Sequence, residues 1–162
     1  MLKEGDAAPS FHVAADDGRT VSLSDYRGKN LILYFYPKAS TTGCTHEAIA
    51  FRDALEDFKG LNAVIVGCSG DSIEAQAKFK AKYKLNFPLL ADTEFSVINA
   101  YGARRMKSFF GKSFLGIVRS TFWIGPDGTI RKTWPRVRVA GHAAEILAAV
   151  QDGEKKRGSG RK

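Results

Sequence analysis

The chain has 162 residues, of which 44% are hydrophobic, and it carries a formal charge of +8 at neutral pH. This length suits one domain with its own core, and the hydrophobic content excludes a chain that is disordered throughout. No apolar stretch approaches the roughly 18 residues of a membrane span, and the first residues lack the apolar segment of a signal peptide. We therefore expect a cytoplasmic protein with no membrane partner.

The first half of the chain predicts alternating strands and helices after an N-terminal β-hairpin. Two runs, 30–35 and 63–68, are apolar on both faces, which is typical of strands covered by helices on each side. Between them, apolar residues recur at helical spacing over 45–58. In chain order we expect a hairpin over 11–23, a strand over 30–35, a helix over 45–58, a strand over 63–68, a helix over 72–83 and an extended piece over 87–90.

The second half predicts a helix over 94–101, a hairpin over 120–134 and a helix over 143–150. The hairpin is indicated by its Gly-Pro-Asp-Gly turn, which suits a type I turn. The aromatic stretch 106–111 reads as a locally packed loop, or else as a rim for an organic ligand or a partner. Together the elements predict an α/β, thioredoxin-like fold, with a central mixed sheet flanked by helices.

The C-terminus holds much of the positive charge. Residues 153–162 contain five basic residues and one acidic residue, which is about half of the excess. Because they show no apolar pattern, we expect a basic, disordered tail after a folded domain over 1–152. A basic tail can bind nucleic acid or a membrane surface, but a solvated tail is the simpler interpretation, and we expect no nucleic-acid partner.

Cys44 is the main candidate for chemistry. It follows the apolar strand by a short loop and lies near the start of the next predicted helix, among hydroxyl-bearing residues and glycine. Backbone N–H groups and the positive end of the helix dipole favour a thiolate there, and the thiolate is the nucleophilic form of sulfur. A buried, inert thiol would instead have apolar neighbours.

Several motifs around this cysteine resemble those of the peroxiredoxins. The pattern Pro37-x-x-x-Thr41-x-x-Cys44 is similar to the active-site signature of that family. The segments 34–38, 51–53, 119–122 and 134–142 resemble the bacterioferritin-comigratory or peroxiredoxin Q subfamily. The resemblance extends from about residue 5 to residue 150. It departs at Thr42, where the family usually has proline.

The resemblance implies a thiol-dependent peroxidase that reduces hydrogen peroxide and organic hydroperoxides in antioxidant defence. Cys44 would be oxidised to a sulfenic acid. Thr41 would contact the sulfur and the peroxide oxygen, Pro37 would shield the pocket, and Arg119 would face the cysteine. Glu47 matches a family glutamate that orients an arginine, although a glutamate in the first helical turn is favourable in any case.

Cys68 leaves the recycling step open. Many subfamily members place a second, resolving cysteine five residues after the first, where this chain has Ile49, and others place it on the helix predicted over 72–83, which has none. Cys68 ends a buried strand, so we interpret it as an inert thiol, with a resolving role as the alternative. The expected mechanism is therefore a one-cysteine cycle in which thioredoxin, glutaredoxin or a low-molecular-weight thiol reduces the sulfenic acid.

Other functions remain to be separated from this one. Cys44 could be the switch of a redox-sensing or interaction module, in which case it would be oxidised once without turnover. A general disulfide oxidoreductase would normally need a Cys-x-x-Cys motif, and Glu47 stands at the second cysteine's position. No nucleotide, haem or metal-binding motif is present, so we expect no cofactor and no metal, and we expect a monomer or weak dimer.

Overall fold

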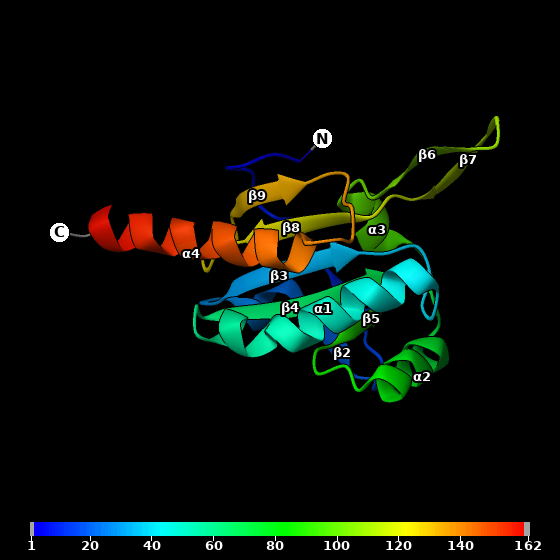
Figure 1. Ribbon diagram of the computed structural model, residues 1–162, viewed down its shortest axis with the longest axis horizontal. Coiled ribbons are helices and arrows are strands. Elements are labelled where there is room, and N and C mark those ends of the chain that lie inside the picture. Colours follow the sequence, from blue (N-terminus) through cyan, green and yellow to red (C-terminus); the bar gives the residue numbers. More distant parts are fainter. Residues whose placement is uncertain (1, 161–162) are drawn as a thin grey trace.

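A five-stranded mixed sheet forms the centre of the computed structural model, which describes residues 2–160 (Figure 1). The central strand β3 pairs in parallel with β4 on one side and antiparallel with β8 on the other. This arrangement confirms the expected mixed sheet. In spatial order the strands are β5 (Leu89–Ala91), β4 (Ala63–Ser69), β3 (Asn30–Phe35), β8 (Ser120–Ile124) and β9 (Ile130–Trp134).

Every residue of β3 is buried, because the sheet is covered on both faces. Successive side chains of a strand point to opposite faces. Accordingly, Tyr34 enters one core cluster with Phe51 and Phe58, whereas Phe35 enters the other. The apolar run that predicted this strand therefore lies between two separate cores and contributes side chains to both.

Helices α1 (Thr42–Lys59) and α4 (His142–Gly160) lie side by side across one face of the sheet (Figure 1). Helix α2 (Ile73–Tyr83) packs on the same core through Phe79, and Ser72 caps it by accepting the Ala75 N–H at 3.1 Å. The short α3 (Ser96–Ala100) packs on the opposite core. The expected N-terminal hairpin is present as β1 (His12–Ala14) and β2 (Thr20–Ser22), followed by the 3-10 helix η1 (Leu23–Tyr26).

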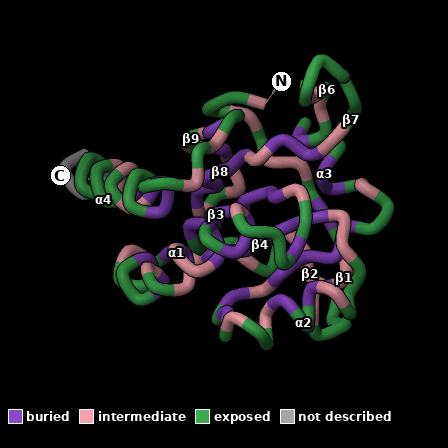
Figure 2. The backbone as a smooth tube through the Cα atoms, turned by 45° about the vertical axis from the view of Figure 1, so that its right-hand side comes forward, coloured by how far each residue is buried: buried purple, intermediate pink, exposed green. Residues whose placement is uncertain are grey.

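The main difference from the expected elements is a second hairpin, β6 (Arg104–Phe109) and β7 (Lys112–Ile117), where the sequence suggested a loop. Its two turn residues, Phe110 and Gly111, both have positive φ, as in a type I′ turn. It projects from the body of the molecule and is mostly exposed (Figures 1 and 2). The expectation that residues 106–111 form a locally packed loop was therefore wrong, because Phe110 is 89% exposed and Phe109 is 65% exposed.

A second difference is the C-terminal segment. Helix α4 continues to Gly160, so residues 153–160 are helical in the structure where the sequence suggested a disordered tail. Contacts with the sheet hold the first two of these residues: Gly153 lies so close to the ring of Trp123 that a Cβ would clash, and Asn30 Nδ2 donates to Glu154 Oε1 at 3.3 Å. The expectation for residues 161–162 falls outside the described residues.

Among residues 2–160, no helix is both long and apolar enough to cross a membrane.

Candidate active site

Cys44 lies in the first turn of α1, directly beyond the end of β3. The helix begins three residues earlier than the apolar pattern predicted, with Thr41 as its N-cap in extended backbone conformation. The first intrahelical bond is from the Thr45 N–H to the Thr41 carbonyl at 2.8 Å. The preceding amides of Thr42, Gly43 and Cys44 therefore have no intrahelical acceptor, and they make this end of the helix favourable for an anion.

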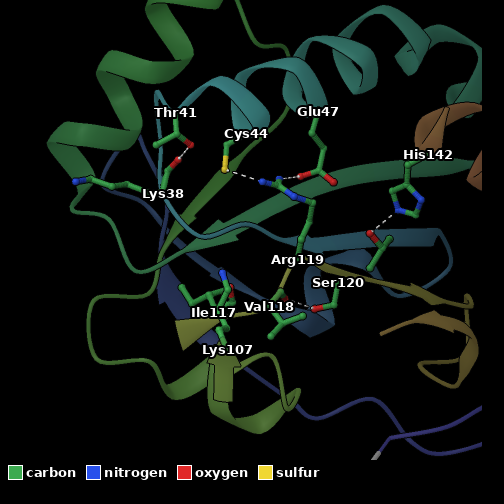
Figure 3. A network of polar contacts seen from close by, with 11 residues as sticks. Lys38, Thr41, Cys44, Glu47, Lys107, Ile117, Val118, Arg119, Ser120 and His142 are labelled. Atoms are coloured by element: carbon green, nitrogen blue, oxygen red, sulfur yellow. Dashed lines mark hydrogen bonds and ion pairs between the residues drawn. The ribbon is translucent and has the colours of Figure 1, made fainter. Parts of the chain in front are cut away.

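Arg119 joins the cysteine to a buried carboxylate (Figure 3). Its Nη2 donates to Cys44 Sγ at 3.4 Å, and its Nη1 donates to Glu47 Oε1 at 2.6 Å. Arg119 lies between β7 and β8, 75 residues from Cys44. A Cβ at Gly43 would lie 3.2 Å from Arg119 Nη2, so glycine there allows the guanidinium to approach the helix. Through these two N–H donors, the guanidinium of Arg119 is held next to the Cys44 sulfur.

The Glu47 side chain is only 2% exposed. Burial raises the pKa of Glu47 to about 7, against the lowering effect of Arg119. Burial alone would lower the pKa of Arg119, but Glu47 and Cys44 raise it overall. Glu47 Oε2 has no hydrogen-bond partner among the described residues, and the same holds for the hydroxyl of the neighbouring Tyr34. The Glu47 carboxyl group therefore accepts a hydrogen bond from Arg119 in a buried position and fixes the guanidinium there.

The loop between β3 and α1 carries the other two expected site residues. The Thr41 hydroxyl donates to the Lys38 carbonyl at 2.8 Å, so in this structure it supports the loop and does not contact the sulfur (Figure 3). Its lone pairs stay available to accept a hydrogen bond. Asp71 Oδ2 accepts the Ala39 N–H at 2.8 Å and ties the loop to the end of β4. Pro37 is half-buried and lines a cavity next to Arg119.

This cavity has a volume of about 640 Å³. Its walls come from the Pro37 loop, from β6, from the β7–β8 junction and from the segment that follows β9. It is bordered by Arg119, whose guanidinium contacts Cys44 Sγ, whereas the Cys44 side chain itself is nearly fully buried. The lining residues are Pro37, Met106, Lys107, Ser108, Val118, Arg119, Arg136, Val137 and Arg138.

Cys68 is not brought to this site. It pairs with Phe35 across the sheet, and its side chain belongs to the opposite core cluster, with Leu90 and Tyr101, whereas Cys44 belongs to the α1 side. Burial raises the pKa of the Cys68 thiol, and Asp92 adds to the effect. Both cysteines are free thiols.

The sequence did not single out two features of the surroundings. His142 is buried: its Nε2 is 2.9 Å from Thr121 Oγ1 and its Nδ1 is 3.0 Å from Glu145 Oε1. Burial lowers the pKa of His142. The alternating Arg136 and Arg138 form one wall of the cavity. The alternation of basic residues was visible in the sequence, but their place on the wall of this cavity was not.

Comparisons with known proteins point to one family. Residues 4–133 match the model of the AhpC/TSA family. The chain is 47% identical over 151 residues to peroxiredoxin Bcp of Bacillus subtilis, with 93% of this chain and 96% of that protein covered. It is 38% identical over 146 residues to peroxiredoxin Bcp of Escherichia coli, with coverages of 90% and 94%.

Solved structures give the same result. A mutant of Xylella fastidiosa PrxQ superposes with a TM-score of 0.90 at 33% identity and covers 95% of this chain and 98% of its own. The bacterioferritin comigratory protein of Xanthomonas campestris superposes with a TM-score of 0.84 at 37% identity, with coverages of 88% and 91%.

Proposed function

This chain belongs to the AhpC/TSA family and is a peroxiredoxin, a thiol peroxidase, and from that premise we propose that Cys44 is its peroxidatic residue. The single observation that carries the assignment is the guanidinium of Arg119, which donates to Cys44 Sγ and to Glu47 at once. A cation held at a cysteine in the first turn of a helix favours the thiolate. The Xanthomonas campestris relative has been studied for alkyl peroxide reduction, and we extend organic hydroperoxides to this chain as substrates beside hydrogen peroxide.

In the first half-reaction the Cys44 thiolate attacks one oxygen of the peroxide. An S–O bond forms, the O–O bond breaks, and the leaving oxygen takes up a proton to become water or an alcohol, while Cys44 becomes a sulfenic acid. Charge moves from sulfur to the leaving oxygen. Hydrogen bonds to charged groups contribute roughly 1.5–3 kcal/mol each, so donors that follow this charge lower the barrier. Arg119 and the free amides of the helix start are those donors.

Thr41 and Pro37 have supporting roles in the proposal. A peroxide entering beside Arg119 would reach the N-cap of α1, where the Thr41 hydroxyl can accept a hydrogen bond while it donates to Lys38. Pro37 would limit the access of water to the sulfur, because it lines the cavity on the side of the loop. Glu47 acts through Arg119 as a positioning residue.

The second half-reaction uses an external thiol. The position of Cys68 supports this one-cysteine mechanism, since Cys68 lies in the opposite core and is fully buried. Thioredoxin, glutaredoxin and low-molecular-weight thiols are the candidate reductants. We keep a cytoplasmic location and a monomer or weak dimer as parts of the proposal; two free thiols suit a reducing compartment.

Peroxide consumption with excess dithiothreitol tests the assignment. The wild-type protein and Cys68→Ser should turn over many times, and Cys44→Ser should lose all catalysis. A sulfenic-acid probe should label Cys44 after a single addition of peroxide. One stoichiometric oxidation without turnover would favour the redox switch, and a quantitative disulfide between Cys44 and Cys68 in the mass spectrum would contradict the one-cysteine mechanism.

A further inference from the structure

Positive side chains surround the cavity beside Cys44. Lys107 comes from β6, Arg119 from the β7–β8 junction, and Arg136 and Arg138 from the segment after β9. The described residues that line the cavity include no carboxylate. Within residues 2–160, neither Arg136 nor Arg138 forms an ion pair with an acidic side chain. We call the cavity with these four residues the basic cleft.

Hydrogen bonds hold the segment that carries Arg136 and Arg138 against β6 and the β7–β8 junction. The Val137 N–H donates to the Arg119 carbonyl at 3.0 Å, and Arg105 donates to the carbonyl of Pro135. Arg136 also lies near Arg105, where burial and this second cation lower the pKa of Arg105. Arg119 is paired with Glu47, but Lys107, Arg136 and Arg138 repel one another and Arg119, and a bound anion relieves this repulsion. The basic cleft is thus built to receive negative charge next to the reactive sulfur.

The size and the remaining walls of the basic cleft indicate the kind of anion. Its volume of about 640 Å³ is within the range of small-molecule sites. Met106, Val118 and Val137 supply apolar surface between the cations. Hydrogen peroxide is small and uncharged and needs none of this. The reductant must come from outside, because Cys68 lies in the opposite core.

We propose that the basic cleft selects, as the electron donor, a small thiol that carries carboxylate groups. This inference rests on the proposed function, because the donor acts on the sulfenic acid of Cys44. The donor sulfur attacks that sulfur, an S–S bond forms, the S–O bond breaks, and the hydroxide leaves as water with the donor's proton. A second donor thiol attacks the donor sulfur of the mixed disulfide, which releases the donor disulfide and returns the Cys44 thiol.

The test compares donors of different charge. With hydrogen peroxide saturating, kcat/KM is measured for mercaptosuccinate, 3-mercaptopropionate and uncharged 2-mercaptoethanol, in the wild type and in Arg136→Gln/Arg138→Gln. The ratio of variant to wild type for each donor cancels the donor's own reactivity. We expect losses of about tenfold for mercaptosuccinate and about threefold for 3-mercaptopropionate at low ionic strength, and no more than about 1.5-fold for 2-mercaptoethanol. About 0.5 M salt should shrink the differences.

Lys59→Gln is the matched control, because it removes one positive charge at the far end of α1, about 22 Å along the helix from Cys44. Lys59→Gln should change kcat/KM by the same factor for all three donors. Equal ratios for the three donors in the double variant would overturn the proposal. So would a loss confined to the peroxide step, seen as slower sulfenic-acid formation with a carboxylate-bearing hydroperoxide and unchanged donor kinetics. If no sulfenic acid forms on Cys44 at all, the proposed function fails instead.

Discussion

The surroundings of Cys44 and the hairpin β6–β7 differ in what holds their side chains. Around Cys44, β3 and α1 are packed between aromatic rings, and Phe51 stacks at 4.6 Å from Tyr34. On the hairpin, Phe109 and Phe110 contact each other at 4.4 Å but remain mostly exposed. Aromatic residues are thus buried in one region and exposed in the other. The hydrophobic content of the sequence alone does not distinguish these two situations.

The comparison predicts that the same substitution has very different costs in the two regions. Phe51→Ala removes a fully buried ring between Tyr34 and Phe58, so it should lower the free energy of unfolding by about 3–5 kcal/mol. Urea unfolding followed by circular dichroism measures the change. A loss under about 1 kcal/mol would mean that the core near Cys44 is looser than the structure shows.

Glu47 is a second way to probe the buried region, through pH. Its pKa is raised by burial to about 7, so folding favours the protonated carboxyl. Its contribution to stability is therefore fully present below its ordinary pKa of about 4.5 and is lost as pH rises through 7. Relative to Glu47→Gln, the wild type should lose about 3 kcal/mol of unfolding free energy between pH 4.5 and pH 8.

Parallel urea titrations of the two proteins at several pH values measure this difference. A gap that stays constant from pH 4.5 to pH 8 would show that Glu47 remains ionised throughout as the partner of Arg119. If the wild type instead gained unfolding free energy relative to Glu47→Gln as pH rises, the pKa of Glu47 would be lowered by folding. The ion pair with Arg119 would then have a larger effect on this pKa than burial.

Arg119 tests whether the buried region acts on the transition state or only on the thiol. Arg119→Lys keeps the positive charge, but a lysine ammonium group lacks the planar pair of N–H groups with which Arg119 donates to Cys44 Sγ and Glu47 at once. We expect the rate constant for sulfenic-acid formation to fall about 10- to 100-fold, as for one lost charged hydrogen bond. The thiolate fraction, measured from the pH dependence of iodoacetamide alkylation, should fall much less. Equal losses in both would assign Arg119 to thiol ionisation alone.

The contrast also explains which parts of the structure could be predicted from sequence. The strand 30–35 and the helix after it were clear because a covered strand is apolar throughout and a core-facing helix repeats every three to four residues. Gly128, the last residue of the β8–β9 turn, has φ of +83°, and its N–H bonds to the Gly125 carbonyl at 2.9 Å, as its turn sequence predicted. Cys44 followed from its position between a strand and a helix, whereas Thr41 and Pro37 were expected through the family resemblance of the motif that precedes it.

What the sequence did not predict depends on contacts without a local period. Apart from Ile117 at its base, the hairpin β6–β7 packs on no core, so its strands show no clean alternation of apolar and polar residues. Its turn uses Phe110 in a left-handed conformation that usually belongs to glycine or asparagine. The extension of α4 depends on Gly153 meeting Trp123, which is 30 residues away in sequence. The bridge from Arg119 to Glu47 was expected only through the family resemblance, since the two are 72 residues apart.

The smallest expected effect comes from the hairpin. Phe110→Ala makes the same chemical change as Phe51→Ala, but at a ring that is 89% exposed, so it should change the unfolding free energy by no more than about 0.5 kcal/mol. Hydrogen peroxide turnover with dithiothreitol should also stay within about twofold of the wild type, because Phe110 does not line the cavity. A destabilisation above about 1 kcal/mol that grows with protein concentration would show that the ring is covered in solution by another copy of the chain. The hairpin would then be a buried surface like the region around Cys44.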